Sequence, residues 1–184
     1  MDEKTKARIM DGTKIRRVLN RLATEVIERN RNLKTLTLVG IRTRGIHLAH
    51  RLAKLIHDLE GVHVPVSVLD ITPYRDDAFA PARPAPGRKV KAKFAVDKKD
   101  ILLVDDVLMT GRTIRAAMEG LFDLGRPRTI QLLTLIDRGH RELPIRPDYI
   151  GKTLPTSRRE KVKVRLKESD GTDEVLITEP ARLR

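Results

Sequence analysis

Two adjacent carboxylates followed by a glycine-containing turn form the segment of this sequence that is best suited to chemistry. Asp105 and Asp106 end a run of apolar residues, and Gly111 follows in the turn. Gly111 allows a close approach of the backbone, and the free N–H groups at the start of a helix attract phosphate. Because two carboxylates repel a phosphate, they are better suited to binding hydroxyl groups or Mg2+. A sugar phosphate supplies both kinds of group, although such a segment can also simply end a strand and open a helix.

Hydrophobic patterning predicts an α/β fold that places this segment at the edge of a sheet. Short apolar runs typical of buried strands cover residues 36–41, 64–71, 101–106 and 129–136. Apolar residues recur at helical spacing over residues 15–27, over the segment with Leu48, Leu52, Leu55 and Leu59 on one face, and over residues 113–124. Strands that alternate with helices indicate a mostly parallel sheet covered on both faces. Ligands bind at the carboxyl edge of such sheets, where the two carboxylates are predicted to lie.

Length and composition predict one domain that covers residues 1–184. The chain is 40% hydrophobic, which is enough to build a core. It contains no cysteine, which excludes disulfides, thiol nucleophiles and cysteine-ligated metal centres. No apolar run approaches the roughly 18 residues of a membrane span, and the charged N-terminal segment lacks the pattern of a signal peptide. We therefore expect a cytoplasmic protein with no membrane contact.

Two parts of the chain depart from the alternation of strands and helices. Residues 72–99 are rich in proline, glycine and lysine and show little apolar periodicity, which predicts a flexible arm within the domain. From residue 137 to residue 184, short alternating stretches are separated by turns. This pattern predicts a set of small antiparallel additions to the α/β core.

The complete motif ILLVDDVLMTGRT at 101–113 resembles the binding signature for phosphoribosyl pyrophosphate (PRPP) of the type I phosphoribosyltransferases. The blocks VGIRTRGIHLAHRLA, ITPYRDD, LIDRGHRELPIRPDYIGKTLPTS and EKVKV resemble a narrower group, the bifunctional pyrimidine-operon attenuation regulators and uracil phosphoribosyltransferases. The resemblance implies the type I phosphoribosyltransferase fold, a mostly parallel sheet flanked by helices with a small hood over residues 137–184 and a flexible loop.

The resemblance implies that uracil and PRPP react to give UMP and diphosphate, with Mg2+ entering with PRPP. Asp105 and Asp106 take the catalytic positions. Arg75 begins an arm that closes over PRPP, and Asp137, Arg138 and Val162 contact uracil. The implied PRPP-binding residues are Thr43, Arg44, Gly45, Arg75, Asp105, Asp106, Val107, Leu108, Met109, Thr110, Gly111, Arg112 and Thr113.

Met109 stands where relatives commonly carry an aromatic residue. Methionine can pack over a ligand, but it supplies neither ring stacking nor a hydroxyl contact. This departure keeps a second hypothesis open, in which the protein only senses nucleotides, binds RNA and has negligible transferase activity. A third hypothesis is transfer of phosphoribose to another base.

The distribution of charge points to a second, polyanionic partner. The formal net charge is +13, yet residues 101–137 contain four basic and five acidic residues. Residues 138–165 contain nine basic and three acidic residues, and the first 31 residues contain nine and five. The excess therefore lies away from the motif, as RNA binding requires and as a merely basic surface also produces.

The resemblance implies that this partner is pyrimidine-operon mRNA, bound under the control of UMP and UTP. It also implies assembly as a homodimer or homotetramer. Asn20 and Thr24 stand where many relatives carry Thr and His, so part of the RNA contact is expected to differ. The candidate RNA-binding residues are Arg17, Arg21, Arg29, His140, Arg141, Arg146 and Lys152.

Overall fold

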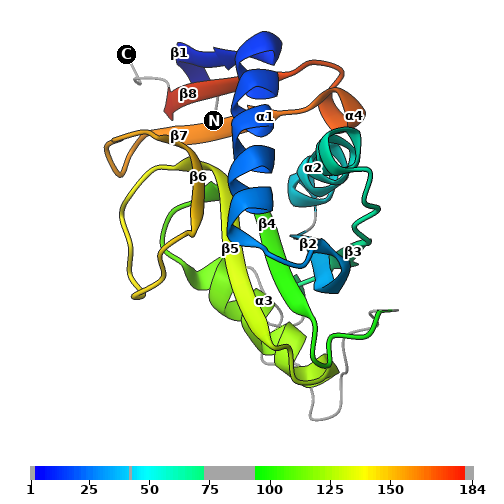
Figure 1. The fold of residues 1–184 in the computed structure, drawn as a ribbon. Helices are drawn as coiled ribbons and strands as arrows, with labels where there is room; N and C mark the ends of the chain where they lie inside the picture. The colour runs from blue at the N-terminus through cyan, green and yellow to red at the C-terminus, as the bar shows by residue number, and fades with distance from the viewer. Residues whose placement is uncertain (1–2, 42, 73–93, 181–184) are drawn as a thin grey trace.

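The computed structural model describes residues 3–41, 43–72 and 94–180. Its centre is a five-stranded sheet in which all four neighbouring pairs run parallel (Figure 1). The strand order is β3-β2-β4-β5-β6. The strands are β2 (Leu36–Ile41), β3 (Val66–Leu69), β4 (Asp100–Leu108), β5 (Thr129–Asp137) and β6 (Tyr149–Thr153).

Helices cover both faces of this sheet (Figure 1). On β4, Leu102 and Val104 pack in the core formed with α1 (Gly12–Arg29) and α2 (Arg44–Glu60). Leu103 points to the opposite face, where α3 (Arg112–Leu124) packs. Because side chains alternate across a strand, the continuous apolar run of β4 supplies both cores.

A second, three-stranded antiparallel sheet forms the hood and joins the two ends of the described chain. Its order is β1-β8-β7, with β1 (Glu3–Asp11), β7 (Lys161–Arg165) and β8 (Glu174–Pro180). Two short helical turns, η1 (Leu33–Thr35) and α4 (Lys167–Asp170), complete the elements. In Figure 1, β1 and β8 lie side by side at the end of the molecule where α1 begins.

The predicted α/β fold with a mostly parallel sheet is confirmed, and three details differ. The strand β1 replaces an N-terminal segment for which the sequence predicted no element. β6 lies parallel to β5 in the main sheet, so the expectation of antiparallel additions after residue 137 is wrong for this strand. On α2, Ile56 is buried, whereas Leu59 is 57% exposed because it lies in the last turn, beyond the sheet.

Most of the arm predicted at 72–99 lies outside the described residues, and so does Arg75. None of the helices in the described parts of the chain is both long and apolar enough to cross a membrane.

Candidate active site

Asp105 and Asp106 lie within β4, near its carboxyl end. Asp105 is 7% exposed and Asp106 is partly buried. Because they are neighbours on a strand, their side chains leave opposite faces of the sheet. The backbone N–H of Asp106 donates to Oδ1 of Asp105 at 3.0 Å. The sequence placed both carboxylates at the end of the strand, whereas the ladder with β5 continues through Leu108 and holds them rigidly.

Burial raises the pKa of both carboxyl groups. The pKa of Asp105 is raised well above its ordinary value, first by burial and then by the negative charge of Asp106. The pKa of Asp106 is raised by burial, and the positive charge of Arg44 counteracts part of that rise. Two adjacent carboxyl groups with raised pKa values in the ligand-free protein are typical of a site that binds positively charged or hydrogen-bonding groups of a ligand.

Asp105→Asn is expected to make the ligand-free protein more stable near neutral pH, by about 1 kcal/mol or about 3 °C in Tm. The folded protein binds the Asp105 proton more tightly than the unfolded chain does, so ionisation of Asp105 destabilises the fold as the pH rises above the ordinary aspartate pKa. Thermal unfolding of both proteins tests this, and the difference should shrink as the pH is lowered toward that ordinary value. An Asn variant less stable than the parent near neutral pH would contradict the penalty assigned to this charge.

Thr43 and the first two residues of α2, Arg44 and Gly45, follow β2, and this start of the helix lies directly against β4. A Cβ added to Gly45 would lie 2.3 Å from the carbonyl oxygen of Val104, the residue before Asp105. A Cβ added to Gly40 would lie 2.3 Å from the Cα of Ile46. Only glycine fits such backbone contacts, so these two positions bring the predicted diphosphate loop to the carboxylates.

Arg44 is held by a carboxylate from the other end of the chain. Its Nη2 and Nε donate to the two carboxylate oxygens of Asp170 at 2.8 and 3.1 Å. The Arg44 guanidinium lowers the pKa of Asp170 to about 2. Two turns further along α2, Arg51 donates hydrogen bonds to the carboxylates of Glu168 and Asp173. The short α4 turn is therefore fastened to α2 beside the predicted diphosphate loop.

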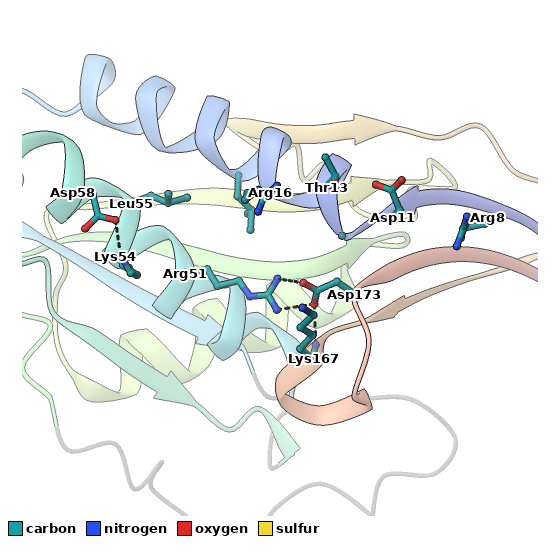
Figure 2. Close-up of a pocket in the computed structure, with 12 residues that line it drawn as sticks. Arg8, Asp11, Thr13, Arg16, Arg51, Lys54, Leu55, Asp58, Lys167 and Asp173 are labelled. Carbon is teal, nitrogen blue, oxygen red and sulfur yellow. Dashed lines mark hydrogen bonds and ion pairs between the residues drawn. The ribbon is translucent and has the colours of Figure 1, made fainter.

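A cavity of about 680 Å3 is lined by residues of β1, α1, α2 and α4, and the ion pair between Arg51 and Asp173 forms part of its wall (Figure 2). Figure 2 shows Arg51 paired with Asp173 and Lys54 paired with Asp58. The wall contains five basic and three acidic residues, and neither carboxylate of β4 is part of it. We therefore do not assign the substrate site to this cavity.

The turn from β4 into α3 is arranged as the sequence predicts for phosphate binding. Gly111 has φ +92°, a conformation that favours glycine, and it takes the N-cap position without a capping side chain. Thr110 Oγ1 accepts from the backbone N–H of Arg112 at 3.3 Å. The first turn of α3 contains no acidic residue of its own, and the carboxylate of Glu142 pairs there with Arg112 at 2.7 Å.

The predicted uracil contacts do not all line one cavity. Asp137 and Arg138 line a cavity of about 510 Å3 between the ends of β5 and β6, and Val162 is not part of its wall. Arg138 is 6% exposed and donates to the carbonyl oxygens of Ser157 and Glu160 at 3.0 and 2.7 Å. Burial lowers the pKa of the Arg138 guanidinium. These bonds give Arg138 a clear role in shaping the 154–160 segment.

Some of the candidate RNA-binding residues are exposed, and others are hydrogen-bonded to other parts of the protein. Arg17 and Arg146 are exposed, and Lys152 is partly exposed on β6. Arg21 donates to the carbonyl oxygens of Ile150 and Gly151 at 3.0 and 2.8 Å, and Arg29 donates to that of Asp148 at 2.9 Å. These two arginines therefore fasten α1 to β6 while their outer atoms remain at the surface.

His140 and Arg141 are bound to the protein more completely than the other candidates. His140 has φ +63°, and its Nε2 lies 2.6 Å from the carbonyl oxygen of Thr156. Arg141 is 23% exposed and makes hydrogen bonds in three directions, including one to the carbonyl oxygen of Met109 in the phosphate turn. Residue type alone assigned both to the RNA surface, and nothing local in the sequence indicates these contacts.

Two residues important to the site escaped the sequence analysis. Asp170, the partner of Arg44, lies 126 positions away along the chain. Gly40 stands in an apolar strand, and a glycine inside a strand was the available signal that a backbone passes closely there.

The comparisons with known proteins agree with this geometry. A family model described as a phosphoribosyl transferase domain matches residues 6–168. The Bifunctional protein PyrR of Pelotomaculum thermopropionicum is 57% identical over 176 residues, which cover 96% of this chain and 97% of that protein. The Bifunctional protein PyrR of Thermus thermophilus is 54% identical over 174 residues, which cover 95% and 96%.

Solved structures agree at the level of the fold. A hypoxanthine phosphoribosyltransferase from Trypanosoma cruzi, solved in a ternary complex with substrates, matches with a TM-score of 0.74 at 15% identity over 96% of both chains. One from Staphylococcus aureus matches with a TM-score of 0.66 at 20% identity. With the family model matching most of its length and relatives more than half identical, this chain belongs to the phosphoribosyltransferase family, among the bifunctional PyrR proteins.

Proposed function

We propose that this protein transfers the phosphoribosyl group of PRPP to N1 of uracil, and that it also binds pyrimidine-operon mRNA as a transcription attenuator controlled by UMP and UTP. One observation carries the enzymatic part. The carboxylates of β4, the start of α2 with Gly45, and the start of α3, whose N-cap residue Gly111 has no capping side chain, lie at the carboxyl edge of the sheet. The names of the relatives support a protein with two functions.

In this proposal, each of the three elements binds one part of PRPP. The turn at Thr110 and Gly111 binds the 5′-phosphate through backbone N–H groups and hydroxyls. Asp105 and Asp106 accept hydrogen bonds from the ribose hydroxyls. The backbone around Gly45 faces the diphosphate. As the bond from C1 to the diphosphate oxygen breaks, positive charge grows on the ribose beside the carboxylates and negative charge grows beside the N–H donors. Uracil N1 then bonds to C1, and its proton passes to the departing diphosphate or to water.

The donor set fits Mg2+ that enters with PRPP. Among the described residues, no group of three or more His, Asp or Glu side chains is arranged to hold a metal ion by itself. Asp105 and Asp106 offer two carboxylates, and Mg2+ in proteins is typically held by one or two carboxylates together with substrate phosphates and water. When bound, Mg2+ neutralises charge on the leaving diphosphate.

Release of diphosphate from PRPP and Mg2+, measured with and without uracil, tests the enzymatic proposal. We expect release that depends on uracil and is matched by UMP. A panel of uracil, hypoxanthine, guanine and xanthine tests whether the base is uracil. Binding of UMP without turnover would instead support the nucleotide sensor, and Met109→Tyr would then test whether the aromatic side chain restores catalysis.

The RNA-binding proposal depends on exposed cations on α1 and in the segment from 138 to 165. Arg17→Gln should weaken binding of a pyrimidine-operon stem-loop about tenfold and lower the slope of log affinity against log salt by about 1. Lys34→Gln is the control, since Lys34 is an exposed cation on η1 that is not among the candidate RNA-binding residues. Equal effects of the two substitutions in a filter-binding assay would count against a defined RNA surface.

We further propose assembly as a homodimer or homotetramer in the cytoplasm, where PRPP and nascent mRNA occur together. Two chains would place two copies of the α1 surface on one RNA. Sedimentation velocity with and without UMP measures the assembly state directly.

A further inference from the structure

A single loop connects the phosphate-binding turn with the candidate RNA-binding residues. We call residues 139–146 the clamp loop. Within it, the backbone N–H groups of Glu142 and Leu143 both donate to the carbonyl oxygen of Thr110, at 3.0 and 3.1 Å. Glu142 also forms an ion pair with Arg112 at 2.7 Å. The clamp loop is thus bonded to the phosphate turn through both backbone and side chains.

The side chain of Arg141 fixes the geometry of this contact. Its Nη1 donates to the carbonyl oxygen of Met109 at 2.9 Å, and its Nε donates to that of Ile145 at 2.9 Å. Its Nη2 donates to Oδ2 of Asp137 at 2.6 Å. One planar guanidinium therefore joins the phosphate turn, the far end of the clamp loop and the end of β5.

We propose that Arg141 is a positioning residue of the nucleotide site, through which occupation of the phosphate turn is transmitted to the clamp loop and its RNA-binding residues. This inference rests on the proposed function and gives it a physical route. Arg141 lines the same 510 Å3 cavity as Asp137 and Arg138, and in this scheme it acts on the site by setting the position of Met109 and Asp137.

The surroundings of Arg141 favour positioning over direct contact with RNA. Its side chain is 23% exposed, and its charge is already paired with Asp137, which is 14% exposed. A phosphate of RNA would have to compete with this short ion pair and with two carbonyl oxygens. Arg146, five residues further along the same loop, is exposed and has no such network among the described residues, so it is the better RNA contact.

The clamp loop is also constrained at its first residues, Gly139 and His140, which limits how the loop can adjust when the phosphate turn shifts. Gly139 and His140 have φ +76° and +63°, and His140 Nε2 is hydrogen-bonded to the carbonyl oxygen of Thr156. For a residue other than glycine, such a φ is uncommon and is retained only where neighbouring contacts enforce it. In this proposal, a shift of the phosphate turn is therefore transmitted to the part of the clamp loop that follows His140, which includes Arg146.

Substitutions that keep or remove the charge of residue 141 separate the two roles. Arg141→Lys keeps a cation but cannot reach three acceptors in three directions, and Arg141→Gln removes the charge. We expect both variants to weaken UMP binding about tenfold, measured by calorimetry, and to reduce the effect of UMP on RNA affinity. Arg17→Gln is the control, expected to lower RNA affinity while UMP affinity stays within about twofold of the parent, because Arg17 is exposed on α1 and is not part of the wall of this cavity.

An Arg141→Lys variant with the UMP affinity of the parent would overturn the proposal and favour a direct contact of Arg141 with RNA. A parent protein that binds no UMP would instead refute the proposed function. Hydrogen exchange on the unsubstituted protein gives a second test that needs no variant. UMP should slow exchange of the Glu142 and Leu143 amides, which donate to Thr110, and unchanged exchange with UMP bound would contradict the coupling.

Discussion

Joint replacement of Asp105 and Asp106 by Asn should lower kcat/KM for UMP synthesis by about a thousandfold and leave RNA affinity within about twofold of the parent. The two carboxylates are neighbours on a central strand, and Asp105 is buried while Asp106 is partly buried, so water screens their charges less than it would at an exposed site. Negative charge in that position stabilises the positive charge that grows on the ribose ring. Asn keeps the size and part of the hydrogen bonding but loses the charge.

Steady-state diphosphate release measures this effect, and Asp58→Asn is the matched control. Asp58 is an exposed aspartate on α2 that pairs with Lys54, so its loss should leave kcat/KM within about twofold. Turnover within tenfold of the parent in the double variant would exclude these carboxylates as the catalytic groups. Taken with the higher stability expected of Asp105→Asn, the double variant should be less active and more heat-resistant.

Gly45→Ala should nearly abolish PRPP binding and destabilise the protein by about 1–3 kcal/mol. The added Cβ would lie 2.3 Å from the carbonyl oxygen of Val104 and 3.4 Å from the Cα of Asp105. Both neighbours belong to the backbone of a central strand, so the start of α2 has to move instead. A displacement of about 1 Å in a substrate-positioning loop costs about a hundredfold in activity.

Gly61→Ala is the control for this prediction. Gly61 ends α2 with φ +67°, and an added Cβ would have no atom within 4 Å. Its substitution introduces only backbone strain, about 1 kcal/mol, and should leave the PRPP affinity unchanged. Thermal unfolding and PRPP titration of both variants compare the effect of crowding at residue 45 with that of backbone strain at residue 61. A Gly45→Ala protein that binds PRPP normally would show that the start of α2 is not held against β4 as the structure places it.

The parts of the fold that the sequence predicted are those with strong local patterns. β2 has the predicted bounds because six consecutive residues of the strand are buried. β1 was missed because charged residues alternate along it, with only Met10 fully buried, and its partner β8 begins more than 160 positions later. The parallel direction of β6 was missed for a related reason, since it depends on pairing with β5 and not on its own residues.

In the candidate site, too, the features with a local sequence pattern were predicted, and those that depend on distant residues were not. The 101–113 motif is contiguous, so residue types and spacing were enough to predict its turn and its carboxylates. The restraints on Arg44 and Arg141 come from Asp170 and from the carbonyl oxygen of Met109, which only the folded chain brings near. Residue type indicated a cation at position 141, but the partners of a cation decide whether it binds a ligand or holds the protein together.

The pairing of β1 with β8 has a consequence for the order in which the protein acquires its parts during synthesis. β1 is translated before the other described elements, yet its register from Glu3 with Pro180 to Asp11 with Glu174 requires β8, which is translated after them. The β2, β4 and β5 strands need no such wait, because all three are complete by residue 137. Contacts between distant residues form late in folding. A nascent chain therefore assembles the central strands of its parallel sheet first and closes the hood last, as β8 emerges.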